Sequence, residues 1–286
     1  MLVIIGSLVV LGSVFGGFAM AGGHLGALFQ PLELLIIGGA AVGAFVLGNT
    51  GKAQKATLKA LPKVMERPRY TKEMYLSLMA LLYDLLAKVR KEGLMSIEQD
   101  VDNPGESPIF SNYPNILEDD HVVEFMTDYL RLMVSGNLNA FELENLMDNE
   151  IETHHQEGEI PVHCISKMAD SMPAFGIVAA VMGVVHTMAS VGLPPSELGE
   201  LIAQALVGTF LGILLGYGLV GPLAAVLEQK LGESTKILQC VRVTLLSSIN
   251  GYAPAVAVEF GRKVLYSTER PSFSELEDCV RQARNR

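Results

Sequence analysis

Two long apolar segments joined by a short turn constrain the fold of this chain more than any other feature. They cover residues 171–193 and 200–227. Crossing about 30 Å of hydrocarbon takes roughly 20 apolar residues at a helical rise of about 1.5 Å each, so each segment is long enough to span a membrane. Two further apolar segments, 2–20 and 32–48, lie at the start of the chain. We therefore predict an all-α integral membrane protein with four transmembrane helices.

Small residues recur along one face of each of the last two apolar segments. The residues are Gly176, Ala180 and Gly183 in the third segment and Gly208, Gly212 and Gly216 in the fourth. Small side chains let helix backbones approach closely, which matters in lipid because burial of apolar surface gives no net driving force there. We expect these two faces to pack against other helices.

The charged residues are few and segregated, and they indicate the topology. Only 18% of the residues are charged, whereas about a quarter are charged in typical soluble domains. Positive charge within about 20 residues of a membrane segment marks the cytoplasmic side, and the turn at 190–200 has no Lys or Arg. A basic cluster directly follows the second apolar segment and consists of Lys52, Lys55, Lys59, Lys63, Arg67 and Arg69. We therefore expect both termini in the cytoplasm.

Helical periodicity continues outside the apolar segments and predicts a large helical cytoplasmic domain. Apolar residues recur at three- and four-residue steps over 74–89 and 122–133, with turn formers at 102–114 between them. Asn139 and Glu142 have the spacing of a capping box for one more helix. The expected organisation is a transmembrane hairpin at 1–51, a cytoplasmic domain at 52–169, a second transmembrane hairpin at 170–227 and a cytoplasmic helical region at 228–286.

The sequence lacks the common signatures of an enzyme or cofactor site. It has no Walker A loop, no GxGxxG after a strand and no HExxH, and the net charge of −10 argues against nucleic-acid binding. His154 and His155 lie among acidic residues, and either a metal site or a solvated helix end accounts for them. His186, toward the outer end of the third segment, is compatible with a proton relay or a structural interfacial role. We predict no catalysis, no cofactor and no metal ligands.

An ion path is a more natural use of four packed helices, but the expected membrane core holds no charged residue. Glu33 and Asp170 lie at its edges. A proton relay needs an ionisable group inside the membrane, where the low dielectric can bring its pKa towards neutrality. If this chain handles protons, a partner must therefore supply the carboxylate. Thr209 lies about mid-bilayer, and its hydroxyl either lines the path or bonds the carbonyl one turn back.

Two prolines mark the inner ends of the last two apolar segments, Pro173 in the third and Pro222 in the fourth. Because these segments run in opposite directions, we expect both prolines at the same depth. A proline inside a helix removes one backbone hydrogen bond and kinks the axis. We interpret the pair as a flexible joint; the alternatives are a first-turn proline at Pro173 and a helix stop at Pro222.

Five stretches together resemble one protein family; they cover 8–23, 48–62, 172–186, 207–218 and 250–277. Over nearly its full length the chain is similar to the MotA family, the larger stator subunit of the bacterial flagellar motor. The resemblance implies a multi-pass protein of the bacterial inner membrane that, with MotB, conducts protons and converts the proton gradient into torque. It also implies a ring of these subunits, expected to be a pentamer, around a dimer of MotB, a single-span protein with an Asp in the membrane.

The resemblance further implies roles for individual residues. Pro173 and Pro222 are assigned to conformational coupling. Charged residues of the cytoplasmic domain contact the rotor protein FliG in this family, and the matching positions are Arg90 and Glu98, with Glu150 as a further candidate. Without the family, these charges would be interpreted as solvated side chains.

The ion path of the family runs between MotB and the third and fourth helices, where Thr209 and Ala180 fall in this chain. In sodium-driven relatives, a Thr occupies the position of Ala180, seven residues after the proline that matches Pro173. A desolvated sodium ion needs oxygen ligands, whereas a proton needs only the partner's carboxylate and a water path. Because Ala180 has no hydroxyl, the resemblance implies a proton-driven motor.

Two other functions are compatible with the residues. An energiser of the ExbB/TolQ type is a related ring that uses the same gradient to act on a periplasm-spanning protein. Such relatives resemble this chain only over the third and fourth helices, and they cross the membrane three times. A structural scaffold or a passive channel would form the same four helices without coupling them to energy.

Overall fold

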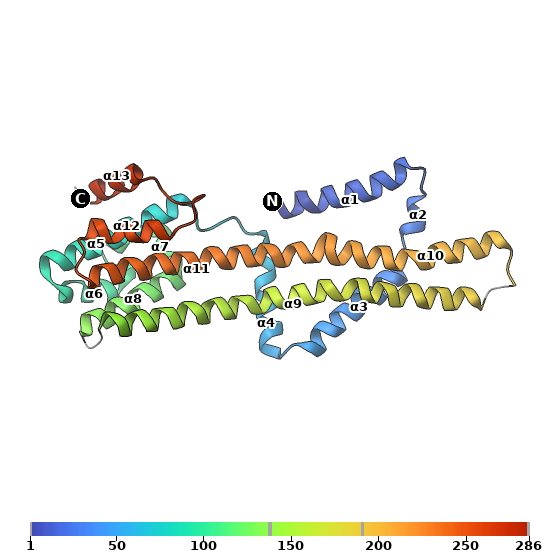
Figure 1. The fold of residues 1–286 in the computed structure, drawn as a ribbon, viewed down its shortest axis with the longest axis horizontal. Coiled ribbons are helices and arrows are strands. Elements are labelled where there is room, and N and C mark those ends of the chain that lie inside the picture. Colours follow the sequence, from blue (N-terminus) through green and yellow to red (C-terminus); the bar gives the residue numbers. More distant parts are fainter. Residues whose placement is uncertain (1, 137–138, 190–191, 285–286) are drawn as a thin grey trace. The chain divides into compact units, whose positions relative to one another are not determined.

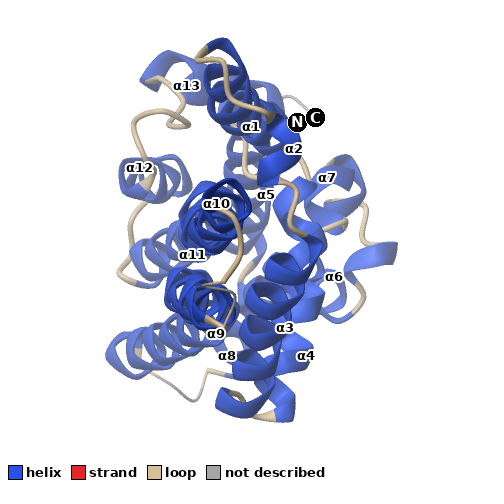
Figure 2. Cartoon of the chain, turned by 90° about the vertical axis from the view of Figure 1, so that its right-hand side faces the viewer, coloured by secondary structure: helices blue, strands red, loops and turns tan. Residues whose placement is uncertain are grey.

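The fold is given by a computed structural model that describes residues 2–136, 139–189 and 192–284. Every regular element in these ranges is helical (Figure 2). The chain forms two compact units, one from Met1–Arg67 with Gly158–Gln229 and the other from Pro68–Glu157 with Lys230–Arg286. The expected turn at 190–200 includes two residues, 190 and 191, that lie outside the described ranges.

The first unit contains the helices that are long and apolar enough to cross a membrane (Figure 1). Four such spans are present in the part of the chain that the structure describes, which confirms the predicted four-helix membrane protein. The elements are α1 (Leu2–Met20), α2 (Leu25–Leu28), α3 (Pro31–Gly48), α4 (Gly51–Ala60), the outer part of α9 (Ala140–Met188), α10 (Pro195–Ile213), a π-helix (Leu214–Val220) and the first turns of α11 (Gly221–Ile249).

Local signals explain where several of these helices begin. Pro31 is the first residue of α3, where its missing N–H costs nothing. Thr50 caps α4 by accepting a hydrogen bond from the Ala53 N–H. Asn139 and Glu142 form the predicted reciprocal capping box at the start of α9, with N···O distances of 2.9 and 3.0 Å.

α9 differs from the expectation because it does not end before the membrane segment. It continues from the capping box to Met188 and contains Pro161 and Pro173 inside the helix. The alternative of a first-turn proline at Pro173 is therefore wrong. Sequence rules favour a new helix at a proline because the ring removes a backbone donor, but a long helix tolerates this loss where neighbouring helices pack around it.

The close packing of α9 on α10 confirms the expectation drawn from the small residues. A β-carbon built on Gly212 would lie 2.6 Å from the Met172 carbonyl oxygen and 2.9 Å from the Gly176 Cα atom. A β-carbon on Gly183 would lie 2.7 Å from that of Ala205. These distances are too short for any side chain, so the backbones touch directly. By contrast, a β-carbon would meet no atom within 4 Å at Gly12, Gly16, Gly39 or Gly43 among the described residues.

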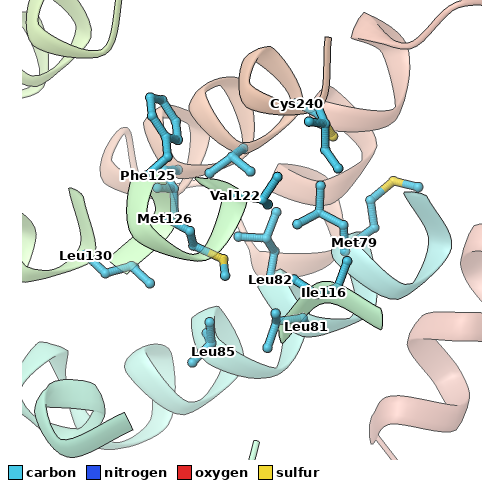
Figure 3. Packing of buried hydrophobic residues seen from close by; sticks show 14 of the residues in the cluster. Met79, Leu81, Leu82, Leu85, Ile116, Val122, Phe125, Met126, Leu130 and Cys240 are labelled. Atoms are coloured by element: carbon cyan, nitrogen blue, oxygen red, sulfur yellow. The ribbon is translucent and has the colours of Figure 1, made fainter. Parts of the chain in front are cut away.

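The second unit has a hydrophobic core of its own. Its helices are α5 (Lys72–Glu92), α6 (Glu98–Asp102), α7 (Pro114–Leu117), α8 (Asp120–Ser135), the first part of α9, the last part of α11, α12 (Pro254–Val264) and α13 (Phe273–Arg284). Leu82 and Leu85 of α5 face Met126 of α8 in this core. Ile116 of α7 and Cys240 of α11 belong to the same buried cluster (Figure 3). Gly93 ends α5 with a φ of 88°, a conformation that glycine adopts without strain.

We predict that Gly212→Ala destabilises the protein while Gly199→Ala does not. The new methyl group at position 212 meets backbone atoms of α9 at 2.6 and 2.9 Å, and overpacking of this kind costs about 1–3 kcal/mol. Gly199 lies in the same helix, α10, but a β-carbon there meets nothing within 4 Å. Thermal unfolding of the purified protein in detergent measures the difference. Equal midpoints for the two variants would show that the contact is not tight.

Candidate functional site

The structure places Ala180 of α9 against Gly208 of α10, the residue before Thr209. The Ala180 backbone nitrogen lies 3.2 Å from the position that a β-carbon of Gly208 would occupy, and Thr209 follows Gly208 directly. Thr209 and Ala180 are both half-buried. The Thr187 hydroxyl bonds the Gly183 carbonyl oxygen one turn back at 2.9 Å, but the structure gives Thr209 no such bond within the described ranges.

Sequence reasoning missed Glu33 as part of this site. A β-carbon on Gly208 would lie 2.6 Å from Glu33 Oε2, so the carboxyl group of α3 enters the gap that Gly208 leaves. This oxygen is buried and has no hydrogen-bond partner among the described residues. Gly208 lies 13 residues after the start of α10 at Pro195, which corresponds to about 20 Å at 1.5 Å per residue. Glu33 thus lies against Gly208, next to Thr209, and not at the edge of the membrane core where the sequence analysis placed it.

The signal for Glu33 was present in the spacing along α3. Glu33, Ile37 and Ala41 follow one another at four-residue steps and therefore share one helix face. Ile37 and Ala41 are 0% exposed and pack on α9 and α10. The face could not be selected from the sequence because α3 is apolar all round, so no polar side indicates which side is buried.

Pro173 and Pro222 do not face each other across the helix pair, contrary to the expectation of a common depth. The Pro173 Cδ atom lies 3.0 Å from a β-carbon built on Gly216, whereas Gly221, just before Pro222, faces Ala169. Pro222 is exposed. Pro173 and the residue before Pro222 therefore face different levels of the helix pair.

A π-helix, Leu214–Val220, immediately precedes α11 and its second residue, Pro222. At the end of this wide turn the Gly221 N–H donates to the Gly216 carbonyl oxygen, five residues back. Proline has no N–H and its ring conflicts with the carbonyl four residues earlier in an α-helix. π-Turns inside α-helices are rare and are frequent at functional sites. The structure thus has a π-helix before Pro222, where the sequence predicted a proline kink.

The proposed rotor-facing residues lie in the second unit. Arg90 is in the last turn of α5, and Glu98 is the first residue of α6. Both side chains are exposed, and neither forms an ion pair with any residue in the described ranges. A groove of about 250 Å³ beside Glu98 is lined by Glu98, Val101, Asp102, Arg131, Val134 and Ser135.

A buried carboxylate fixes α6, and with it Glu98, to α5. Asp100 is 4% exposed and accepts hydrogen bonds from Lys88 Nζ at 2.7 Å and from the Ser107 hydroxyl at 2.6 Å. Since Lys88 belongs to α5, this network holds Arg90 and Glu98 in a defined relation. Glu150 is different: it is half-buried and accepts a hydrogen bond of 2.7 Å from the Tyr129 hydroxyl, whose pKa burial raises.

His154 and His155 of α9 are half-buried and contact neighbouring helices. His154 contacts His121 of α8 at 2.6 Å between ring nitrogens and the Ser234 hydroxyl of α11 at 3.1 Å. His155 contacts the Thr235 hydroxyl at 3.2 Å. Within the described ranges no three His, Cys, Asp or Glu side chains gather as metal ligands would. His186 is exposed near the end of α9.

Comparisons with known proteins agree with this architecture. Residues 4–93 match the family model described as Motility protein A N-terminal, and residues 118–240 match that of the MotA/TolQ/ExbB proton channel family. Motility protein A of Salmonella typhimurium is 62% identical over 285 residues, which cover 100% of this chain and 97% of that protein. Chemotaxis protein LafT of Vibrio parahaemolyticus is 37% identical over 273 residues, covering 96% of each.

Solved structures show the same fold. The chain matches the structure of C. jejuni MotAB with a TM-score of 0.78 and 19% identity, covering 95% of this chain and 98% of that one. It matches the flagellar MotAB stator complex from Bacillus subtilis with a TM-score of 0.74 and 24% identity, covering 96% and 98%. The chain therefore belongs to the motility protein A family, within the MotA/TolQ/ExbB proton channel family.

Proposed function

We propose that this chain, with a MotB-type partner, conducts protons through the inner membrane of a bacterium and converts their flow into torque on the flagellar rotor. The match to motility protein A over the full length at 62% identity carries this proposal. The separate match of residues 4–93 to the motility-specific family favours the motor over an energiser of the ExbB/TolQ type. The chain acts as a stator subunit and not as an enzyme.

The partners follow from the relatives and from the chemistry of the membrane part. The solved relatives are complexes named MotAB, which supports a MotB-type partner. The family resemblance implies that this partner has a single span with an Asp in the membrane. The chain forms a ring, expected to be a pentamer, around this partner, and its second unit contacts FliG. The basic cluster that begins at Lys52, directly after α3, supports cytoplasmic termini.

The ion path runs along the contact of α9 with α10. Thr209 lines it with a hydroxyl, and Ala180 lines it with a methyl group at the same level. With a single hydroxyl the pair is a poor ligand set for a dehydrated sodium ion, which needs several oxygen atoms. It is compatible with a proton, which moves through water and carboxyl groups.

The coupling of ion flow to movement uses Pro173 and Pro222. Protonation of the partner's Asp removes a buried charge and thus weakens its hold on the surrounding helices. Pro173 contacts Gly216 inside the π-helix, so a shift of α9 presses on the segment whose backbone is most easily rearranged. α11 continues from this segment into the second unit and carries the movement there, where Arg90, Glu98 and Glu150 act on the rotor.

We predict that a flagellated strain that depends on this chain swims at a speed independent of external sodium. At fixed pH and membrane potential the speed should stay constant as sodium is varied, and a protonophore should stop the cells. Each proton that crosses 100 mV releases about 2.3 kcal/mol, so many must pass per revolution. A speed that rises with sodium and is blocked by a sodium-channel inhibitor would overturn the ion assignment.

We predict that reversing Arg90 and Glu98 together (Arg90→Glu with Glu98→Lys) impairs swimming in soft agar and that reversal of the matching rotor charges restores part of it. Each single reversal should have a small effect, because an exposed ion pair contributes only about 0–1 kcal/mol. The control is the same double reversal at Glu277 and Arg281, an exposed ion pair of 3.2 Å on α13. Normal swimming of the Arg90/Glu98 double variant would refute the contact.

We predict that Pro222→Ala leaves the amount of stator in the membrane unchanged but lowers the stall torque strongly. Alanine restores the N–H and removes the ring, which favours an ordinary α-helix by about 3 kcal/mol. Pro254→Ala is the matched control, because Pro254 is the first residue of α12, where no backbone donor is needed. If Pro222→Ala instead prevents accumulation of the protein, Pro222 acts in folding; normal torque would exclude a role in coupling.

A further inference from the structure

Glu33 differs from the other acidic residues of the membrane unit because one of its oxygens is enclosed by the chain itself. Oε2 lies in the gap at Gly208, where a β-carbon would stand 2.6 Å away. It is buried and has no hydrogen-bond donor among the described residues. The side chain as a whole is only half-buried, so the carboxyl group also reaches the surface of the chain.

A permanently ionised carboxylate is a poor occupant of this gap. Burial of a charged oxygen without a donor or a cation is strongly unfavourable, and protonation removes the charge. In the described ranges Glu33 takes part in no ion pair. Its neutral form suits the enclosed position, whereas the ionised form needs water or a donor from outside the chain.

Within the described ranges, the nearest neighbours of the gap that Glu33 enters carry no titratable side chain. The residues of α9 and α10 at this gap are Ala179, Ala180 and Gly208. Along α9 the nearest titratable side chain is His186, six residues from Ala180 or about 9 Å along the axis; along α10 it is Glu200, eight residues from Gly208 or about 12 Å. His24 precedes α2. A proton exchange at Glu33 would therefore need water or a group of another chain.

The surroundings of Glu33 place it beside the proposed ion path. Gly208, which makes room for the carboxyl group, is the neighbour of Thr209 and contacts Ala180. Glu33 is in the first turn of α3, and the basic cluster that marks the cytoplasmic side follows the other end of that helix. The carboxyl group is thus on the external side of α3.

We propose that Glu33 is a second proton-carrying group of the path, on the external side of the partner's Asp. The Glu33 carboxylate takes up a proton from external water and becomes a neutral acid that fits the gap at Gly208. It then releases this proton, through water beside Thr209, to the ionised Asp of the MotB-type partner and returns to the carboxylate form. This inference rests on the proposed proton conduction.

The test compares Glu33→Gln with Glu197→Gln, an exposed acidic residue in the first turn of α10. Swimming speed is measured against external pH at fixed membrane potential, together with the amount of stator in the membrane. Glu33→Gln is expected to accumulate normally, to swim more slowly and to lose the dependence of speed on external pH, because glutamine keeps the shape but carries no exchangeable acid proton. Glu197→Gln should keep the wild-type profile.

Two results for Glu33→Gln would overturn the inference. A wild-type profile would show that Glu33 carries no proton, and a speed reduced by the same factor at every pH would show a structural role. If Glu33→Gln fails to accumulate, Glu33→Asp replaces it: a pH-dependent speed is expected because a carboxyl group remains, and a flat profile or absence from the membrane overturns the inference. Failure of proton conduction itself is distinguishable, since the unmodified protein would then respond to external sodium.

Discussion

The direct backbone contact between α9 and α10 is the interaction on which the membrane unit depends. Lipid offers no hydrophobic drive for helix association, so close packing and the dispersion forces it allows must hold the helices together. Gly176, Gly208 and Gly212 each stand where a β-carbon would lie within 3.1 Å of the opposite helix. An axial shift of one helix would bring bulkier residues into these gaps. α9 and α10 are therefore in direct backbone contact over this length.

The direct contact with α9 continues into the π-helix. Gly216 is the last of the four-residue series and faces Pro173, and beyond it the Gly221 N–H bonds five residues back instead of four. A π-turn holds one more residue per hydrogen-bonded ring than an α-turn, so the backbone can change register there without breaking the helix. Pro222 keeps this stretch from closing into a regular α-helix. The proposed coupling therefore assigns the rearrangement to these seven residues.

Sequence patterns predicted the parts of this architecture that depend on local signals. Apolar length located the four spans, and the spacing of Asn139 and Glu142 located the start of α9. The continuity of α9 through Pro173 was not predictable, because a proline looks the same at a helix start and inside a helix supported by neighbours. The position of Glu33 was missed for a related reason: which face of a uniformly apolar helix is buried is decided by tertiary packing.

Asp100 and Glu33 differ in whether a buried oxygen of the carboxyl group has a hydrogen-bond donor. Asp100 accepts hydrogen bonds from Lys88 and Ser107, so its charge is compensated and its position fixed. Such a group holds two helices together. The enclosed oxygen of Glu33 has no donor in the described part of the chain, so its surroundings favour the neutral acid without fixing it. A chain that satisfies one buried carboxylate and leaves another unsatisfied keeps the second available for exchange with a partner or with water.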